Sequence, residues 1–240
     1  MLPRIVDVRK NILKKNDLAA AALRDRFRDA GVFVVSLVSS PGAGKTTVLE
    51  RTLTLLRPRV RVAALVGDLA TDCDADRLRR SGAPVRQITT GTVCHLDAEM
   101  IGRALDGWPL DELDCLFIEN VGNLVCPAAY DLGEQLRVVL LSVTEGEDKP
   151  LKYPTIFNTA DVTVVTKIDL ASAVGFDRDA LLRNVESVRP GMPVLEMSAR
   201  TGDGMSAWLD LVTAHGQRLV AAAGNSGSAA LQGCPPVGQA

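Results

Sequence analysis

The stretch SSPGAGKTT, residues 39–47, decides the fold of this chain. It follows the apolar, β-branched run VFVVSLVS (32–39) and precedes TTVLERTLTLL (46–56), which has the spacing of a helix closed by Pro58. A glycine-rich turn between a buried strand and a helix is typical of a phosphate-binding loop, because backbone N–H groups and the helix N-terminus face the anion there. The stretch matches G-x-x-x-x-G-K-[ST] except that Ser39 replaces the first glycine.

The residue types of this loop predict separate roles. Gly42 and Gly44 allow backbone N–H groups to approach the phosphates, and Lys45 is the expected catalytic cation at the β and γ oxygens. The Thr46 hydroxyl is the expected Mg²⁺ ligand at the same place. The alternative, an ordinary glycine-rich turn, is disfavoured by the GKT tripeptide and by its position between a strand and a helix. The other residues expected to contact the nucleotide are Pro41, Ala43 and Thr47.

Apolar strands alternate with amphipathic helices along the rest of the chain. Such alternation predicts βαβ units, and therefore an α/β fold of the P-loop NTPase type, with a mostly parallel sheet covered by helices on both faces in a single domain. Further strands are expected in 60–68, 113–120, 136–144, 161–169 and 192–198, and further helices in 74–82, 96–105, 177–188 and 205–219.

The two ends of the chain differ from this middle part. Residues 1–31 predict an N-terminal amphipathic helix that ends at Gly31, and 32–220 form the predicted nucleotide-binding domain. Residues 221–240 are rich in glycine, alanine, serine and proline, which is typical of a disordered tail. The apolar residues at helical spacing near the N-terminus are Ile5, Val8, Ile12, Ala19 and Leu23.

Composition excludes some classes of function. Of the 240 residues, 47% are hydrophobic and 23% are charged, so a sizeable core can be buried, and the net charge of −2 gives no support to nucleic-acid binding. Neither a membrane-spanning apolar run nor the apolar segment of a signal peptide is present, so we expect a cytoplasmic protein without a membrane partner. Five cysteines in such a protein favour metal-binding, catalytic or buried thiols over disulfides.

Two motifs after predicted strands indicate a guanine base. TKID (166–169) resembles the N/T-K-x-D signature, in which the Asp169 carboxylate accepts the two guanine N–H donors and the Lys167 stem lies under the base. Thr166 stands where asparagine is usual. The string SAR, which comprises Ser198, Ala199 and Arg200, resembles the loop that closes over guanine. The order of the TKID and SAR motifs along the chain, each after a predicted strand, favours GTP over ATP.

Acidic residues end two of the predicted central strands. Asp68 in VGD and Glu119 in FIENVG are expected at the carboxyl edge of the sheet near the P-loop. Asp68 is a candidate Mg²⁺ ligand, direct or through water, and Glu119 is a candidate for both the Mg²⁺ site and catalysis. Glu119 with Gly122 resembles the D-x-x-G switch, in which Gly122 senses the γ-phosphate. The alternative for either carboxylate is a helix cap or a surface charge.

These motifs together resemble the hydrogenase nickel-incorporation GTPases, the HypB family of the dimerising (SIMIBI) class of P-loop GTPases. The resemblance covers residues 36–170 in family order, and the N-terminal helix and the SAR loop also fit. CHLDAE, ENVGNLVCP and TEGEDKPLKYP are not general GTPase motifs, which narrows the resemblance to this family. The matching strings are SSPGAGKTT, GDLATDCDADR (67–77), TGTVCHLDAEM (90–100), FIENVGNLVCP (117–127), SVTEGEDKPLKYP (142–154) and KIDL (167–170).

Cys94, His95 and Cys126 offer the soft and borderline ligands that suit Ni²⁺ or Zn²⁺. From the residues alone, buried structural cysteines are the better interpretation. The resemblance implies instead that these three residues form a metal site, embedded in the domain and close to a dimer interface. Cys126 lies seven residues after Glu119, so a γ-phosphate that moves the switch would also move a metal ligand.

The resemblance implies the remaining parts of a GTP-hydrolysing, Mg²⁺-dependent nickel metallochaperone. Asp74 is the candidate that orients the attacking water, and Lys149 and Lys152 match the family's lysine loop, which reaches toward the nucleotide or the neighbouring subunit. The implied partners are a second copy on GTP binding, a [NiFe]-hydrogenase large-subunit precursor and the small zinc-containing nickel chaperone (HypA type). Many members carry an N-terminal CxxCGC-type motif or a histidine-rich stretch, and this chain has neither.

Three alternatives stay open on the sequence. The chain resembles, less closely, the accessory GTPases of urease or of cobalamin-dependent mutases, against which the CHLDAE and DKPLKYP strings argue. A non-catalytic scaffold, in which the nucleotide only locks a metal-binding dimer, is the second. The third is that the cysteines hold a structural zinc. Cys73 is interpreted as incidental and Cys115, inside a predicted strand, as part of the core.

Overall fold

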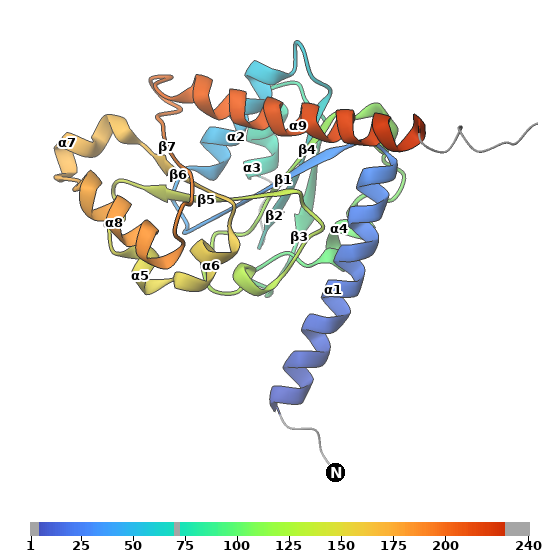
Figure 1. Ribbon diagram of the computed structural model, residues 1–240, viewed down its shortest axis with the longest axis horizontal. Helices are drawn as coiled ribbons and strands as arrows, with labels where there is room; N and C mark the ends of the chain where they lie inside the picture. The colour runs from blue at the N-terminus through green and yellow to red at the C-terminus, as the bar shows by residue number, and fades with distance from the viewer. Residues whose placement is uncertain (1–4, 70–72, 229–240) are drawn as a thin grey trace, which may run out of the picture.

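The computed structural model describes residues 5–69 and 73–228, and within these residues seven strands form one sheet in the order β3-β2-β4-β1-β5-β6-β7 (Figure 1). Neighbouring strands are parallel throughout. The fold is therefore the predicted parallel α/β arrangement. The strands are β1 (Phe33–Ser39), β2 (Val62–Asp68), β3 (Val85–Thr89), β4 (Cys115–Glu119), β5 (Leu136–Ser142), β6 (Val162–Thr166) and β7 (Val194–Glu196).

Helices connect the strands, and a local side chain caps the first turn of two of them. Asp97 accepts a hydrogen bond from the Met100 N–H, and Asp177 accepts one from the Ala180 N–H, so two helices begin where N-cap residues predict. The helices are α1 (Ile5–Asp29), α2 (Lys45–Leu56), α3 (Cys73–Arg79), α4 (Ala98–Ala104), α5 (Lys149–Lys152), α6 (Pro154–Thr159), α7 (Ala171–Val174), α8 (Arg178–Val188) and α9 (Met205–Ser228).

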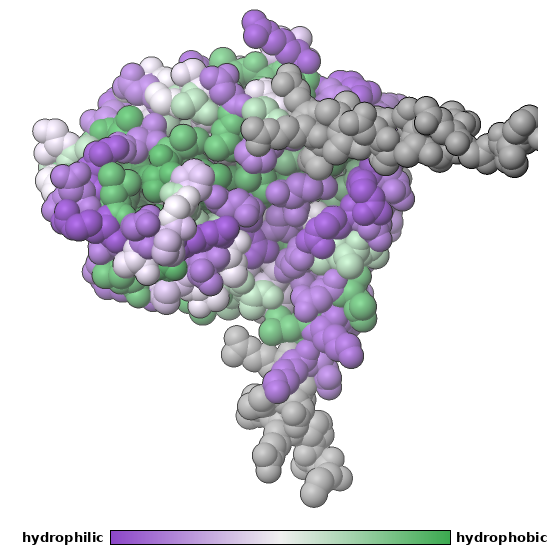
Figure 2. Space-filling view, viewed as in Figure 1, coloured by the Kyte–Doolittle hydropathy of each residue, from purple (hydrophilic) through white to green (hydrophobic). Residues whose placement is uncertain are grey.

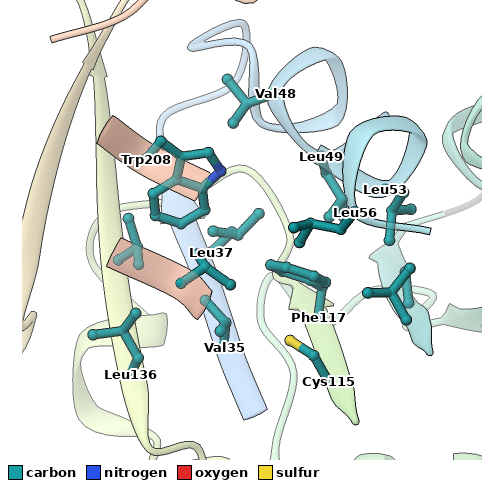
Figure 3. Packing of buried hydrophobic residues seen from close by; sticks show 14 of the residues in the cluster. Val35, Leu37, Val48, Leu49, Leu53, Leu56, Cys115, Phe117, Leu136 and Trp208 are labelled. Atoms are coloured by element: carbon teal, nitrogen blue, oxygen red, sulfur yellow. The ribbon is translucent and has the colours of Figure 1, made fainter. Parts of the chain in front are cut away.

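Both faces of the sheet are buried, as the nearly continuous apolar strands require. On one face α2 and α9 pack against alternate residues of β1, α3 packs beside β2 and β3, and Trp208 of α9 donates a hydrogen bond to Thr52 of α2. Figure 3 shows Cys115 pointing into this layer beside Phe117, so this thiol belongs to the core, as predicted. On the other face α1 and α4 cover the side of β2 and β4, and α6 and α8 cover the side of β5 and β6.

Helix α1 does not bury the whole apolar stripe that its sequence predicts. Leu23 is buried against the sheet, whereas Ile12 is 51% exposed. Figure 1 shows α1 leaving the body of the molecule toward its beginning, and the residues of the protruding part that are coloured in Figure 2 are mostly hydrophilic. None of the helices in the described ranges combines the length and apolar character needed to cross a bilayer.

Two features differ from the sequence-based expectation. Strand β3 was not predicted, because it is a short edge strand in which Ile88 is buried while Arg86 and Gln87 interrupt the apolar pattern. At the C-terminus, residues 221–228 were expected to begin the disordered tail, but they continue α9, whose alanine-rich sequence is compatible with a helix. Residues 229–240, including Cys234, lie outside the described residues.

Candidate functional site

The P-loop follows β1, the central strand of the sheet, and leads directly into α2. Gly42 and Gly44 have φ angles of 78° and 94°, a left-handed conformation that glycine adopts without steric cost. The Lys45 ammonium is buried and donates a hydrogen bond of 2.9 Å to the Ser39 hydroxyl. Burial lowers the pKa of Lys45. Ser39, the departure from the usual glycine, therefore supplies an acceptor for the lysine that is expected to face the phosphates.

A buried carboxylate lies against the P-loop at the end of β4. Glu119 accepts a 2.7 Å hydrogen bond from the Thr46 hydroxyl through Oε1, while Oε2 has no hydrogen-bond partner among the described residues. Burial raises the pKa of Glu119 to about 7, against the opposing charge of Lys45. Asp68, at the end of β2, lines the same cavity. A hydroxyl and two carboxylates are oxygen donors of the kind Mg²⁺ prefers, so the residues fit this ion.

The cavity beside the P-loop has a volume of about 480 Å³. Asp74 and Arg77 of α3 form its outer wall, and Arg77 donates a 3.0 Å hydrogen bond to the Thr47 hydroxyl. Gly122 packs so closely on the loop that an added Cβ would lie 3.0 Å from the Pro41 Cα. The cavity thus brings Asp74, the candidate that orients the attacking water, and Gly122, the expected switch glycine, next to the P-loop backbone. Residues 70–72 lie outside the described residues.

A second cavity of about 450 Å³ adjoins the first and shares Gly44, Thr47 and Lys167 with it. Ala199 lines it together with Asp169, whose carboxylate accepts a 2.6 Å hydrogen bond from the Ser198 hydroxyl and a 3.0 Å bond from Arg200 Nε. The Ser198 hydrogen bond lowers the pKa of Asp169, with a further contribution from Arg200. The two base-reading motifs therefore meet at one cavity beside the P-loop.

Two residues of the TKID motif brace the P-loop itself. The Thr166 hydroxyl donates a 2.6 Å hydrogen bond to the Ala43 carbonyl, and Lys167 Nζ donates one of 2.7 Å to the Gly42 carbonyl. Lys167 adopts a left-handed backbone with φ of 59°, which directs the chain from β6 toward the base cavity. Threonine thus serves as a donor to the loop at the position where asparagine is usual.

The structure separates the two lysines of the expected lysine loop. Lys149 Nζ lies 3.4 Å from the Ser40 hydroxyl of the P-loop and 3.6 Å from the Glu145 carboxylate. Lys152 instead pairs with Asp148 on the surface, and neither lysine lines either cavity. Lys149 is therefore at the nucleotide side within one subunit, and Lys152 is not.

The three expected metal ligands lie together at the end of the sheet that carries the P-loop. The sulfurs of Cys94 and Cys126 are 3.1 Å apart, and the ligand atoms of Cys94, His95 and Cys126 all lie within 4.8 Å of one another. The thiol–thiol hydrogen bond, with burial, raises the pKa of Cys94, and burial lowers the pKa of His95. The Tyr130 ring packs on His95 with centroids 4.0 Å apart. Two sulfurs and a neutral imidazole fit Ni²⁺ or Zn²⁺.

Two asparagines that sequence reasoning missed join this cluster to the P-loop side. Asn120 Oδ1 accepts hydrogen bonds of 3.0 Å from the Leu96 N–H and 2.9 Å from the Val121 N–H, in a fully buried position. Asn123 Nδ2 donates a 3.2 Å bond to the Cys94 carbonyl. Two of these partners, the Leu96 N–H and the Cys94 carbonyl, are backbone groups more than twenty residues away in the sequence. The one available signal was two amides in the short segment between Glu119 and a proposed ligand.

Comparisons with known proteins agree with this geometry. Residues 33–196 match the family described as CobW/HypB/UreG, nucleotide-binding domain. The hydrogenase maturation factor HypB of Azotobacter chroococcum mcd 1 is 51% identical over 208 residues, which cover 86% of this chain and 68% of that protein. The hydrogenase/urease maturation factor HypB of Helicobacter pylori is 43% identical, with 81% of each chain covered. The crystal structure of HypB from Helicobacter pylori in complex with nickel superposes with a TM-score of 0.80 at 40% identity, covering 85% of this chain and 96% of that one.

Proposed function

The chain belongs to the CobW/HypB/UreG family as a hydrogenase maturation factor of the HypB type, and on this basis we propose that it is a GTP-hydrolysing nickel metallochaperone. Its client would be a [NiFe]-hydrogenase large-subunit precursor. Nickel is the cargo, and Cys94, His95 and Cys126 hold it. The nickel complex of the Helicobacter pylori relative supports the choice of metal.

The chemistry of hydrolysis needs positioning and charge neutralisation more than covalent catalysis. Lys45 and the backbone N–H groups of the P-loop neutralise the β and γ oxygens, and Asp74 orients the attacking water. Thr46, Glu119 and Asp68 hold Mg²⁺, which supplies further neutralisation of phosphate charge when bound. Asp169 selects guanine because its carboxylate accepts both N–H donors of that base.

One observation carries the coupling of nucleotide to metal: a single short segment, 119–126, touches both. It begins at Glu119, which accepts a hydrogen bond from Thr46 of the P-loop, and ends at Cys126, a proposed nickel ligand. Between them, Asn120 and Asn123 bind the backbone around Cys94. A γ-phosphate that displaces this segment changes the spacing of the ligands.

GTP is expected to favour a homodimer, and hydrolysis to reverse it and release or rearrange the nickel. Lys149, which already lies beside the P-loop, would contact the nucleotide, and Lys152, which pairs with Asp148 on the surface, would reach the second subunit. A small zinc-containing nickel chaperone of the HypA type is the proposed partner in transfer. The resemblance to the family supports these partners.

Nickel titration in two nucleotide states tests the proposal. We expect the Ni²⁺ affinity of the full chain to differ at least about fivefold between GDP and a non-hydrolysable GTP analogue, and bound Ni²⁺ to change nucleotide affinity by the same factor. Replacing both Cys94 and Cys126 by Ala should abolish the difference while GTP binding persists. Identical isotherms for wild type and variant in both states would leave a plain GTPase.

Two further measurements separate the alternatives. GTP turnover in the presence of Mg²⁺ distinguishes a hydrolase from a scaffold that the nucleotide only locks. Hydrogenase and urease activities of a deletion strain distinguish the two client enzymes. Loss of urease activity alone would contradict the proposed client.

A further inference from the structure

A buried asparagine on α1 binds two segments of the chain at once. Asn16 is 6% exposed. Its Nδ2 donates a 2.9 Å hydrogen bond to the Asp131 carbonyl, and its Oδ1 accepts a 2.9 Å bond from the Ala98 N–H. An asparagine amide carries a donor and an acceptor on one rigid group, so it can connect two backbone groups that do not touch each other.

Both backbone groups belong to the segments that carry the proposed nickel ligands. We name residues 94–98 the first arm, which includes Cys94 and His95 and ends at the start of α4. Residues 126–131 are the second arm, which begins at Cys126 and ends at Asp131. Asn16 thus bridges the two arms at their last residues, Ala98 and Asp131. The arms also meet at the Tyr130–His95 ring contact and at the two cysteine sulfurs. Figure 1 shows α1 running beside α4.

We propose that Asn16 is a positioning residue for the three-ligand cluster: it sets the register of the two arms and thereby the strength of nickel binding. The proposal rests on the proposed function for its metal, but the register of the arms can be measured without metal. Removal of the amide leaves the buried Ala98 N–H and the partly buried Asp131 carbonyl without this partner, so the arms would move to find others.

A second contact of α1 reaches one arm only. Arg24 donates to both carboxylate oxygens of Asp131, at 2.8 and 2.7 Å, and no hydrogen bond of its side chain to the first arm is present among the described residues. Substitution of Arg24 therefore loosens the second arm alone, whereas substitution of Asn16 releases both. Comparison of the two variants therefore separates the contribution of each arm to nickel binding.

The first test is a Ni²⁺ titration of the nucleotide-free full chain. Asn16→Ala should weaken Ni²⁺ binding by about tenfold, the lower end of the effect of groups that orient metal ligands, and should change the thiolate-to-nickel absorption band. Asn16→Asp keeps the acceptor for Ala98 and should recover part of the loss. Asn11→Ala, an exposed asparagine of the same helix, is the matched control and should behave as wild type. Affinity for a GTP analogue should be unchanged in all three.

The second test measures the register of the arms without metal. In a background with Cys73 and Cys234 replaced by Ser, an azo oxidant such as diamide joins the Cys94 and Cys126 thiols. The two thiols lose two electrons and two protons, and the azo group becomes a hydrazine. The Cys94–Cys126 disulfide should form several-fold more slowly in Asn16→Ala than in wild type or Asn11→Ala.

Unchanged nickel affinity together with an unchanged disulfide rate in folded Asn16→Ala would overturn the inference. If wild type binds no nickel, the proposed function fails, and the disulfide rate alone decides the role of Asn16. If circular dichroism shows that Asn16→Ala does not fold, Asn16→Asp replaces it, because its carboxylate keeps an acceptor for the Ala98 N–H and removes only the donor to the Asp131 carbonyl. A disulfide rate equal to wild type in that variant would then count against the positioning role.

Discussion

The nucleotide side and the metal side of this molecule are built in different ways. The phosphate-binding residues sit on consecutive positions of one loop, held by the ends of β1, β4 and β6. The proposed nickel ligands come from two arms that are separate in sequence and held by amide side chains, namely Asn16, Asn120 and Asn123. We therefore expect loss of a single hydrogen bond to disturb the metal side more than the nucleotide side.

Removal of the P-loop cation should break the nucleotide side and spare the metal side. Lys45→Ala deletes the charge expected at the β and γ phosphates, so GTP hydrolysis should fall by about 100- to 1000-fold. The Ser39 hydroxyl, which accepts from Lys45, keeps its own hydrogen bond to the Ser40 carbonyl in the variant, so the protein should stay folded. Single-turnover hydrolysis measures the nucleotide side, and Ni²⁺ titration of the GDP-free protein measures the metal side. Hydrolysis close to the wild-type rate would remove Lys45 from the site.

Substitution of the base-reading carboxylate should change specificity without changing the metal side. Asp169→Asn replaces an acceptor pair by one acceptor and one donor, so the preference for GTP over XTP should fall by about a hundredfold. Competition binding with GTP, ATP and XTP is the measurement. Unchanged selectivity for GTP would show that the Asp169 carboxylate does not contact the base. Asp179→Asn, at the start of α8 away from the cavity, is a matched control.

The amide that joins the two sides should affect both when it is removed. Asn120→Ala leaves the Leu96 and Val121 N–H groups unpaired, so the free energy of unfolding should fall by about 1–3 kcal/mol. The ratio of Ni²⁺ affinities in the GDP and GTP-analogue states should also approach one. Urea unfolding and the two titrations measure these effects. Asn123→Ala, at a partly exposed position, should give smaller changes of the same kind. If Asn120→Ala keeps the wild-type ratio of Ni²⁺ affinities, other residues couple the nucleotide to the metal.

The smallest expected effect is a pH dependence that belongs to the nucleotide side. The pKa of Glu119 is raised by burial from 4.5 to about 7, so the folded state binds a proton that the unfolded state has lost. The contribution of this proton binding to the free energy of unfolding is fully present below pH 4.5 and disappears as pH rises through 7. The nucleotide-free protein should therefore lose about 1 kcal/mol of unfolding free energy between pH 6 and pH 8. Urea titrations of wild type and Glu119→Gln test this, since the variant should lack that part of the slope.

The same contrast explains what could be predicted from the sequence. The P-loop, its flanking strand and helix, and the base motifs are local patterns, and the structure places them around adjoining cavities. Cys94, His95 and Cys126 could be grouped only through a family resemblance, because their approach depends on the packing of distant segments. Asn16 and Asn120 could not be found, since an amide that binds backbone has no periodicity or spacing. Strand β3 was missed because a half-buried edge strand lacks a continuous apolar run.

The strand order has a consequence for how the protein is made. Strand β1 leads into the P-loop but pairs only with β4 and β5, at Cys115 and Leu136 and beyond, among the strands of the described chain. During synthesis the glycine-rich loop therefore leaves the ribosome long before the strands that flank it, and contacts this distant in sequence form slowly. Nucleotide capture becomes possible only once β4 and β5 have emerged and paired. Until then the apolar β1 segment is an exposed, aggregation-prone part of the nascent chain, which makes early chaperone binding most useful at this segment.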